Sequence, residues 1–223
     1  MAAGVLATPA TLPPANVAAA TGLDQGGPPD TVATMVTHTL PDRPADATLQ
    51  ATTERRVLAD SRLSHIFSPD DRTRKSPTTE WPSRALTHLV AAYGDGGMLC
   101  SGVFVGANVV LTAAHCIYGF EEDAKGWPDQ LLVLPGEDGR GKEPFGRYRA
   151  KTLTVPDGWR TTADTGNPDP QYDWGLVVLR ENLSQTVGNM KVGALSEATL
   201  DRGDFGVTTG GYPGDKPLGT QWW

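Results

Sequence analysis

Cysteine and histidine are both scarce in this sequence. Only two cysteines, Cys100 and Cys116, occur in 223 residues, and the four histidines are scattered along the chain. No C-x-x-C pair is present, and structural zinc is held by clusters of these residue types. We therefore expect no metal site. Two cysteines alone do not settle whether the chain works in an oxidising compartment.

Positive charge and long apolar runs are also lacking. Lysine and arginine number 19 against 26 acidic residues, which gives a formal net charge of −7. With no basic cluster in the chain, this balance argues against nucleic acid or an anionic membrane as a partner. No apolar run approaches the length that spans a bilayer. The hydrophobic content of 39% is enough for a core, and the length allows one or two compact units.

The first 50 residues contain few aromatic side chains. They are rich in Ala, Pro and Thr, so we expect a mostly disordered leader. Residues 1–7 have no basic region and only a short apolar run, which makes a poor signal peptide. Two interpretations stay open: the tail of a signal peptide whose true start lies upstream, or a plain disordered leader. Residues 53–67 carry a mixed charged and apolar pattern that favours a short helix.

What the chain does contain is a strand pair that leads to a histidine. Residues 109–116 (V-V-L-T-A-A-H-C) begin as a buried β-strand, and residues 100–105 form a second strand. The linker 106–108 (G-A-N) is short enough for a hairpin, because Gly and Asn tolerate positive φ. The small residues before His115 allow a tight turn that leaves the imidazole accessible. A core histidine beside a structural cysteine is the alternative interpretation of a bare His-Cys pair.

This segment resembles the histidine segment of the chymotrypsin-like serine proteases, in which the pattern is T-A-A-H-C. The resemblance implies that His115 is the general base of a Ser-His-Asp triad. It also implies a disulfide between Cys100 and Cys116, which would clamp the hairpin beside His115. Closing a loop of this length contributes on the order of 3 kcal/mol in the chain-entropy model. An oxidised pair implies in turn a secreted, extracellular protein.

A second segment, residues 169–179, places a carboxylate before an apolar strand. It reads D-P-Q-Y-D-W-G-L-V-V-L and resembles the family's Y-D-[WYF]-[GA] segment, which implies that Asp173 is the triad aspartate. The order His115 then Asp173 is that of the superfamily. A simple strand cap is the alternative role for Asp173, and Asp169, in an N-P-D-P setting, is interpreted as a turn residue.

Four further stretches narrow the resemblance to the glutamyl endopeptidases, the bacterial V8-like branch. They are D-D-R-T-R at 70–74, T-T-E-W-P at 78–82, P-G-E-D-G at 135–139 and G-Y-P-G-D-K-P-L-G-T-Q-W at 211–222. By this resemblance residues 1–67 are the leader and propeptide of a zymogen, and cleavage after Glu or Asp is expected. A solvated charged linker is the alternative interpretation of the first stretch.

Strand-sized segments separated by turn residues, with no long helical pattern, predict an all-β fold. Strands are expected at 84–93, 131–134 and 148–155, a polar loop at 119–130, and a turn at 156–159 followed by a loop to 171. The resemblance implies a chymotrypsin-like double β-barrel, complete in its first barrel (68–183) and partial in its second (184–223). His88, on the first strand, is interpreted as a surface or packing residue.

None of the eight serines stands in the G-x-S-G setting of the family's nucleophile. They are Ser61, Ser64, Ser68, Ser76, Ser83, Ser101, Ser184 and Ser196. The resemblance therefore implies a nucleophile beyond residue 223 and an inactive fragment. A non-catalytic, protease-like binding module is the alternative, and an extracellular structural β-domain with His115 and Asp173 unrelated is a third. A polypeptide substrate and a monomeric chain are expected, and no cofactor is implied.

Overall fold

A computed structural model describes residues 33–42, 69–94, 96–121, 124–193, 195–203 and 206–223. The helix expected over 53–67 and the signal-peptide question lie outside these residues. None of the helices in the described ranges has the length and apolar character of a membrane span.

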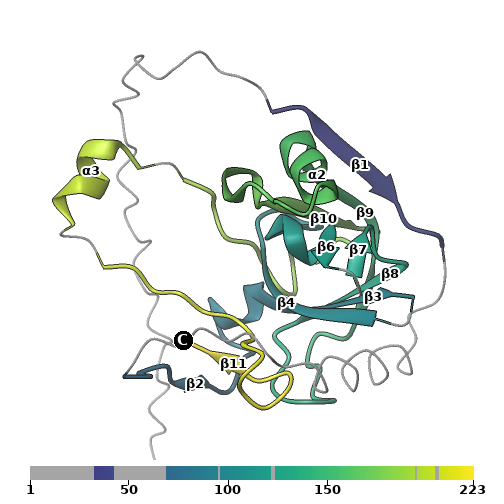
Figure 1. Cartoon of the computed structure of the whole chain (residues 1–223). Coiled ribbons are helices and arrows are strands. Elements are labelled where there is room, and N and C mark those ends of the chain that lie inside the picture. Colours follow the sequence, from purple (N-terminus) through teal and green to yellow (C-terminus); the bar gives the residue numbers. More distant parts are fainter. Residues whose placement is uncertain (1–32, 43–68, 95, 122–123, 194, 204–205) are drawn as a thin grey trace, which may run out of the picture. The chain divides into compact units, whose positions relative to one another are not determined.

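Six antiparallel strands close into a barrel (Figure 1). They are β3 (Leu86–Tyr93), β4 (Gly96–Phe104), β5 (Val109–Thr112), β8 (Gln130–Pro135), β9 (Tyr148–Pro156) and β10 (Gly175–Leu179). Their order around the barrel is β9-β10-β5-β4-β3-β8, and β8 pairs back onto β9 to close it. The strands predicted at 131–134 and 148–155 and the β4–β5 hairpin are confirmed.

Apolar side chains from every strand fill the barrel. Leu89, Phe104, Val110, Val133, Leu153 and Val177 are each 0% exposed. Fully burying one such side chain stabilises the fold by about 1.5–3 kcal/mol. The alternate positions Val90, Leu132 and Leu134 form a second buried cluster, because successive strand residues point to opposite faces. Strands β3 and β8 are therefore covered on both faces.

Two segments that the sequence analysis treats as loops and turns contain regular structure. Within 119–130, β6 (Gly119–Glu121) pairs with β7 (Ala124–Gly126). The predicted turn at 156–159 is instead the start of α2 (Asp157–Asp164). This helix buries Trp159 and Ala163, which share a face because they are four residues apart. The other short helices in the described part of the chain are η1 (Ser83–Ala85), η2 (Ala114–Cys116), η3 (Pro170–Tyr172) and α3 (Glu197–Arg202).

Part of the segment predicted to be disordered is ordered. Strand β1 (Met35–Thr39) pairs with β9 along its whole length and runs beside it in Figure 1. The sequence M-V-T-H-T-L is rich in β-branched residues and free of Gly and Pro, as strands commonly are. The composition of the surrounding 50 residues hides this short run.

The segment just before the barrel meets the last residues of the chain in a small sheet. Strand β2 (Arg74–Lys75) pairs with β11 (Gln221–Trp222), next to the C-terminus in Figure 1. Thr73 and Trp223 exchange two backbone hydrogen bonds, of 2.7 and 2.9 Å. Residue 67 and residue 183 as domain boundaries stay predictions.

Candidate active site

His115 lies on η2, directly after barrel strand β5. The side chain is 41% exposed, whereas its neighbours Ala114 and Cys116 are buried. A disulfide between Cys100 and Cys116 ties η2 to β4, which confirms the predicted pairing. The histidine therefore stands at the barrel rim on a short turn that is fixed at both ends.

Asp173 reaches the same rim because β10 pairs with β5. Gly175 lies opposite Thr112 in that pairing. Asp173 precedes Gly175 by two residues and His115 follows Thr112 by three, so the ends of two adjacent strands bring both side chains together. The competing Asp169 accepts a hydrogen bond from the Gln171 amide and caps η3, as its interpretation as a turn residue requires.

Two hydrogen bonds join His115 to Asp173. Nδ1 of the imidazole lies 2.8 Å from Oδ2, and the His115 backbone N–H donates to Oδ1 at 2.9 Å. Partial burial opposes ionisation of the carboxyl, but the hydrogen bonds from His115 outweigh it and hold the pKa of Asp173 below its ordinary value. The ionised carboxylate only accepts, so Nδ1 carries the proton and Nε2 is left as the basic nitrogen.

A cavity of about 340 Å³ opens beside this pair. Its lining consists of Met98, His115, Phe120, Glu121, Trp159, Pro168, Pro170 and Asp173. Most of these side chains are apolar, and the Trp159 ring centroid lies 6.4 Å from that of His115. Among the described residues, no serine lines this cavity. The space can receive an apolar group next to the imidazole.

Sequence reasoning missed Trp159 and Phe120 as parts of the site. Trp159 sits on α2, donates its indole N–H to the Tyr118 carbonyl at 2.9 Å and packs edge-on against Phe120. Burial, together with a hydrogen bond to Asp164, raises the pKa of Tyr118 to about 12. The phenol therefore stays neutral and pins the end of α2. In the sequence this helix has only weak local signals, which are Asp157 in its first turn and the spacing of four residues between Trp159 and Ala163.

The sulfur and nitrogen atoms of Cys100, His115 and Cys116 lie within 4.8 Å of one another. Such a set resembles a metal site, because thiolates and imidazole are zinc ligands. Both sulfurs are bonded to each other, so neither is a thiolate in this structure. The three residues therefore form a disulfide beside His115 and offer no thiolate ligand to a metal ion.

His88 is a packing histidine, as one of its two interpretations requires. It is 2% exposed, and its Nδ1 lies 2.6 Å from Oε2 of the fully buried Glu137. The ring stacks on Tyr212 with centroids 5.3 Å apart. His88 does not line the cavity beside His115. No local pattern in the sequence marks Glu137 as a buried residue, because its partner His88 lies 49 residues away.

The stretches 70–74 and 211–222, which carry part of the sequence resemblance, contact each other. Arg72 binds the carboxylates of Asp70 and Asp215, and Lys216 also binds Asp70. These four residues are called the clasp below. The clasp lies beside the β2–β11 pairing and links residues 70–72 to residues 215–216.

Comparison with known proteins gives one family match and several relatives. A model of the family described as Trypsin matches residues 72–221. The glutamyl endopeptidase of Bacillus licheniformis is 35% identical over 160 residues, covering 72% of this chain and 46% of that protein. An extracellular metalloprotease of Bacillus subtilis is 32% identical over 161 residues (71% and 48% covered), and a glutamyl endopeptidase of Staphylococcus epidermidis is 31% identical over 163 (71% and 51%).

The chain thus spans about half the length of the curated relatives it matches. Among solved structures, a Glu endopeptidase in complex with MPD aligns with a TM-score of 0.51 at 22% identity, covering 68% of this chain and 66% of that one. This likeness is one of fold, and it confirms the chymotrypsin-like β-barrel architecture expected from the sequence.

Proposed function

Because the chain belongs to the trypsin family of serine proteases, we propose that it carries the general base and the carboxylate of a secreted serine endopeptidase. The observation that supports this is the double hydrogen bond between His115 and Asp173 at a cavity open to solvent. If Asp173 only capped a strand, its carboxylate would not need to contact the imidazole of His115.

In the proposed reaction, Nε2 of His115 takes the proton of a serine hydroxyl as that oxygen attacks the scissile carbonyl. The same nitrogen then gives the proton to the leaving amine. Asp173 holds the Nδ1–H tautomer and stabilises the imidazolium that forms between the two steps. Its lowered pKa keeps it ionised throughout the neutral range.

The serine is proposed to lie outside these 223 residues. Ser101 is engaged elsewhere, since its Oγ accepts the Tyr212 amide hydrogen bond at 2.8 Å. The other serines lack the glycine-flanked setting whose amide groups build an oxyanion hole. We therefore expect the 223 residues alone to hydrolyse no peptide bond, since triad members act as a unit.

Cleavage after Glu or Asp is proposed from two supports. Two of the relatives described above are named glutamyl endopeptidases, and the stretch 211–222 carries the branch motif. By the same resemblance, residues 1–67 act as leader and propeptide, and the active form arises by cleavage near the start of the D-D-R-T-R stretch.

The test starts with the reading frame downstream of the Trp223 codon. An in-frame G-x-S-G segment supports the enzyme, and the chain extended through it should cleave a chromogenic peptide after Glu faster than one after Lys. His115→Ala in that extended chain should lower kcat/KM by about 10⁴-fold or more, while the exposed Lys125→Ala control leaves it unchanged.

Three outcomes would contradict the proposal. A stop codon with no serine segment would favour a non-catalytic, protease-like binding module. Hydrolysis by the purified 223-residue chain would place the nucleophile within it. Full activity of His115→Ala would remove the base from the mechanism.

A further inference from the structure

Strand β1 occupies an edge of the barrel that no other described strand covers. One edge of β9 pairs with β10. The other pairs with β8 only at Tyr148 and Arg149, and β1 covers it from Thr152 to Pro156. An uncovered strand edge presents free N–H and C=O groups that bind a further strand. Residues 35–39 of the N-terminal segment supply this further strand.

Backbone contacts extend the pairing beyond both ends of β1. The Leu40 amide donates to the Lys151 carbonyl at 2.9 Å, and the Asp157 amide donates to the Thr34 carbonyl at 2.7 Å. The second bond satisfies one of the free amides at the N-terminus of α2. Residues 34 to 40 therefore form one continuous ladder along β9.

Side chains give this ladder a specific register. Leu40 is 4% exposed and belongs to the main hydrophobic core. Thr37 and Thr154 join their hydroxyls at 3.0 Å. A shift by one residue would move Leu40 to the opposite face of the strand, so this pairing is selected by sequence and not by backbone alone.

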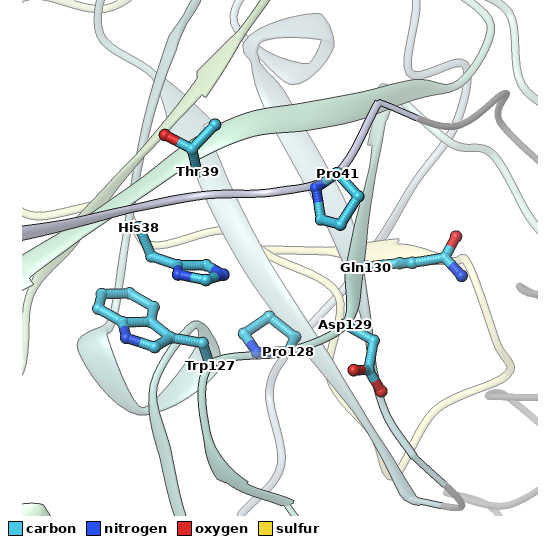
Figure 2. A pocket seen from close by; sticks show the side chains of 7 residues that line it. All are labelled: His38, Thr39, Pro41, Trp127, Pro128, Asp129 and Gln130. Atoms are coloured by element: carbon cyan, nitrogen blue, oxygen red, sulfur yellow. The ribbon is translucent and has the colours of Figure 1, made fainter.

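His38 adds an aromatic contact to the segment before β8. Its ring stacks on Trp127 with centroids 5.2 Å apart and planes 13° from parallel. Figure 2 shows the imidazole pointing from β1 toward Trp127 and Pro128, with Thr39 on the other side of the strand. These residues line a cavity of about 450 Å³ that also contains Pro41, Asp129 and Gln130.

The contacts continue from Trp127 to the site beside His115. Trp127 packs edge-on against Tyr118 at 4.9 Å, and the Tyr118 carbonyl accepts the hydrogen bond from Trp159. Trp159 lines the cavity next to His115. The segment 34–40 therefore contacts α2, which carries Trp159, and Trp127, which packs against Tyr118.

We propose that residues 33–42 are a docking strand for the edge of β9, which binds non-covalently and stays bound when the chain is cut between Asp42 and Pro69. The edge of β9 and Trp127 form its binding site, and the occupant is this chain's own N-terminal segment. This docking does not depend on peptidase activity, so it can be tested independently of the proposed function.

The test uses the full chain with a recognition sequence for a site-specific protease inserted within residues 43–68. After cutting, native size-exclusion chromatography should show the N-terminal fragment eluting with the barrel. Leu40→Ala should weaken this association by about thirtyfold or more, because emptying a buried leucine site costs about 2 kcal/mol at least. Met35→Ala, on the same strand but 36% exposed, is the matched control and should leave the association intact.

Amide hydrogen exchange on the uncut chain gives an independent measurement. The Leu40 amide faces β9, and strand alternation gives His38 and Val36 the same direction. These three amides should exchange at least about tenfold more slowly than those of Thr37 and Thr39. Separate elution of the wild-type fragment, equal behaviour of Leu40→Ala and Met35→Ala, or fast exchange at all five amides would overturn the proposal.

Discussion

The guanidinium of Arg72 holds the carboxylate of Asp215 across 143 residues of sequence. Nη1 donates to Oδ1 at 3.0 Å and Nη2 to Oδ2 at 2.6 Å. The same guanidinium binds Asp70 through Nε and Nη2, and Lys216 binds Asp70 at 2.7 Å while its ammonium stands over the Trp222 ring. Two stretches identified separately in the sequence are thus one charged contact in space.

Arg72→Ala should lower the free energy of unfolding in a pH-dependent way. Hydrogen bonds from Arg72 hold the pKa of Asp215 and of Asp70 below the ordinary 3.8. A depressed folded-state pKa stabilises the fold above the unfolded value, and the effect is lost as the pH falls through the folded value. The free energy of unfolding of the wild type should therefore exceed that of the variant by a constant amount from about pH 5 to 8. The difference should be smaller below about pH 4.

Urea unfolding across this pH range measures the difference, with Lys125→Ala as a control for removing one exposed positive charge. Added salt should shrink it, because these groups are partly exposed and screened. A difference that grows toward low pH would contradict the linkage.

Asp173→Asn should change the tautomer of His115 without unfolding the barrel. The amide can donate as well as accept, so Nδ1–H is no longer the required form. NMR of the ¹⁵N-labelled chain should show neutral His115 as the Nδ1–H tautomer in the wild type and a shift toward Nε2–H in the variant. This readout needs no serine. An Nε2–H wild type would contradict the assigned hydrogen bond.

In an extended, active chain the same substitution should lower kcat by about 10⁴-fold, the size of effect seen for a triad aspartate in the type enzyme of this superfamily. KM should change little, because Asp173 acts through His115 and not on the substrate. A loss confined to KM would mean that Asp173 binds substrate instead.

Cys100→Ser/Cys116→Ser should destabilise the chain by about 3 kcal/mol, since the disulfide closes a loop of 16 residues. Urea unfolding of the oxidised wild type, the reduced wild type and the double variant measures this. The reduced wild type should resemble the variant. Equal stability of all three would show that η2 is held by packing alone.

The parts of the site that the sequence predicted are those set by local chemistry. His115 and Asp173 stand at strand ends, where a few neighbouring residues specify the strand, the turn and the exposed side chain. Their meeting follows from the antiparallel pairing of β5 with β10. The expectation that the two side chains act together came from the family resemblance, because no local pattern states which strands are neighbours.

The missed parts have weak local signals or distant partners. Strand β1 lies in a segment whose average composition indicates disorder, although its own five residues alternate between exposed and partly buried positions. Helix α2 has only eight residues, too short for a clear helical period, and its stability comes from burying Trp159. Contacts such as His38 with Trp127 join residues 89 positions apart and need the fold to be known.

Glu137→Ala should be the most destabilising of these side-chain changes. Glu137 and His88 are 0% and 2% exposed and lie 2.6 Å apart. Removing one member of a buried pair costs about 3–5 kcal/mol, because the other keeps its desolvation penalty without its partner. Glu80→Ala, which removes a carboxylate that is 65% exposed, is the matched control and should cost less than about 1 kcal/mol.

Tyr212 stacks on His88 and Gln221 donates to the Tyr212 hydroxyl, so the loss of Glu137 should also release the segment 211–222 from the barrel. Faster amide exchange in that segment, with little change in β9, would locate the damage there, whereas a uniform loss of protection would mean that the buried pair supports the whole barrel and not this attachment.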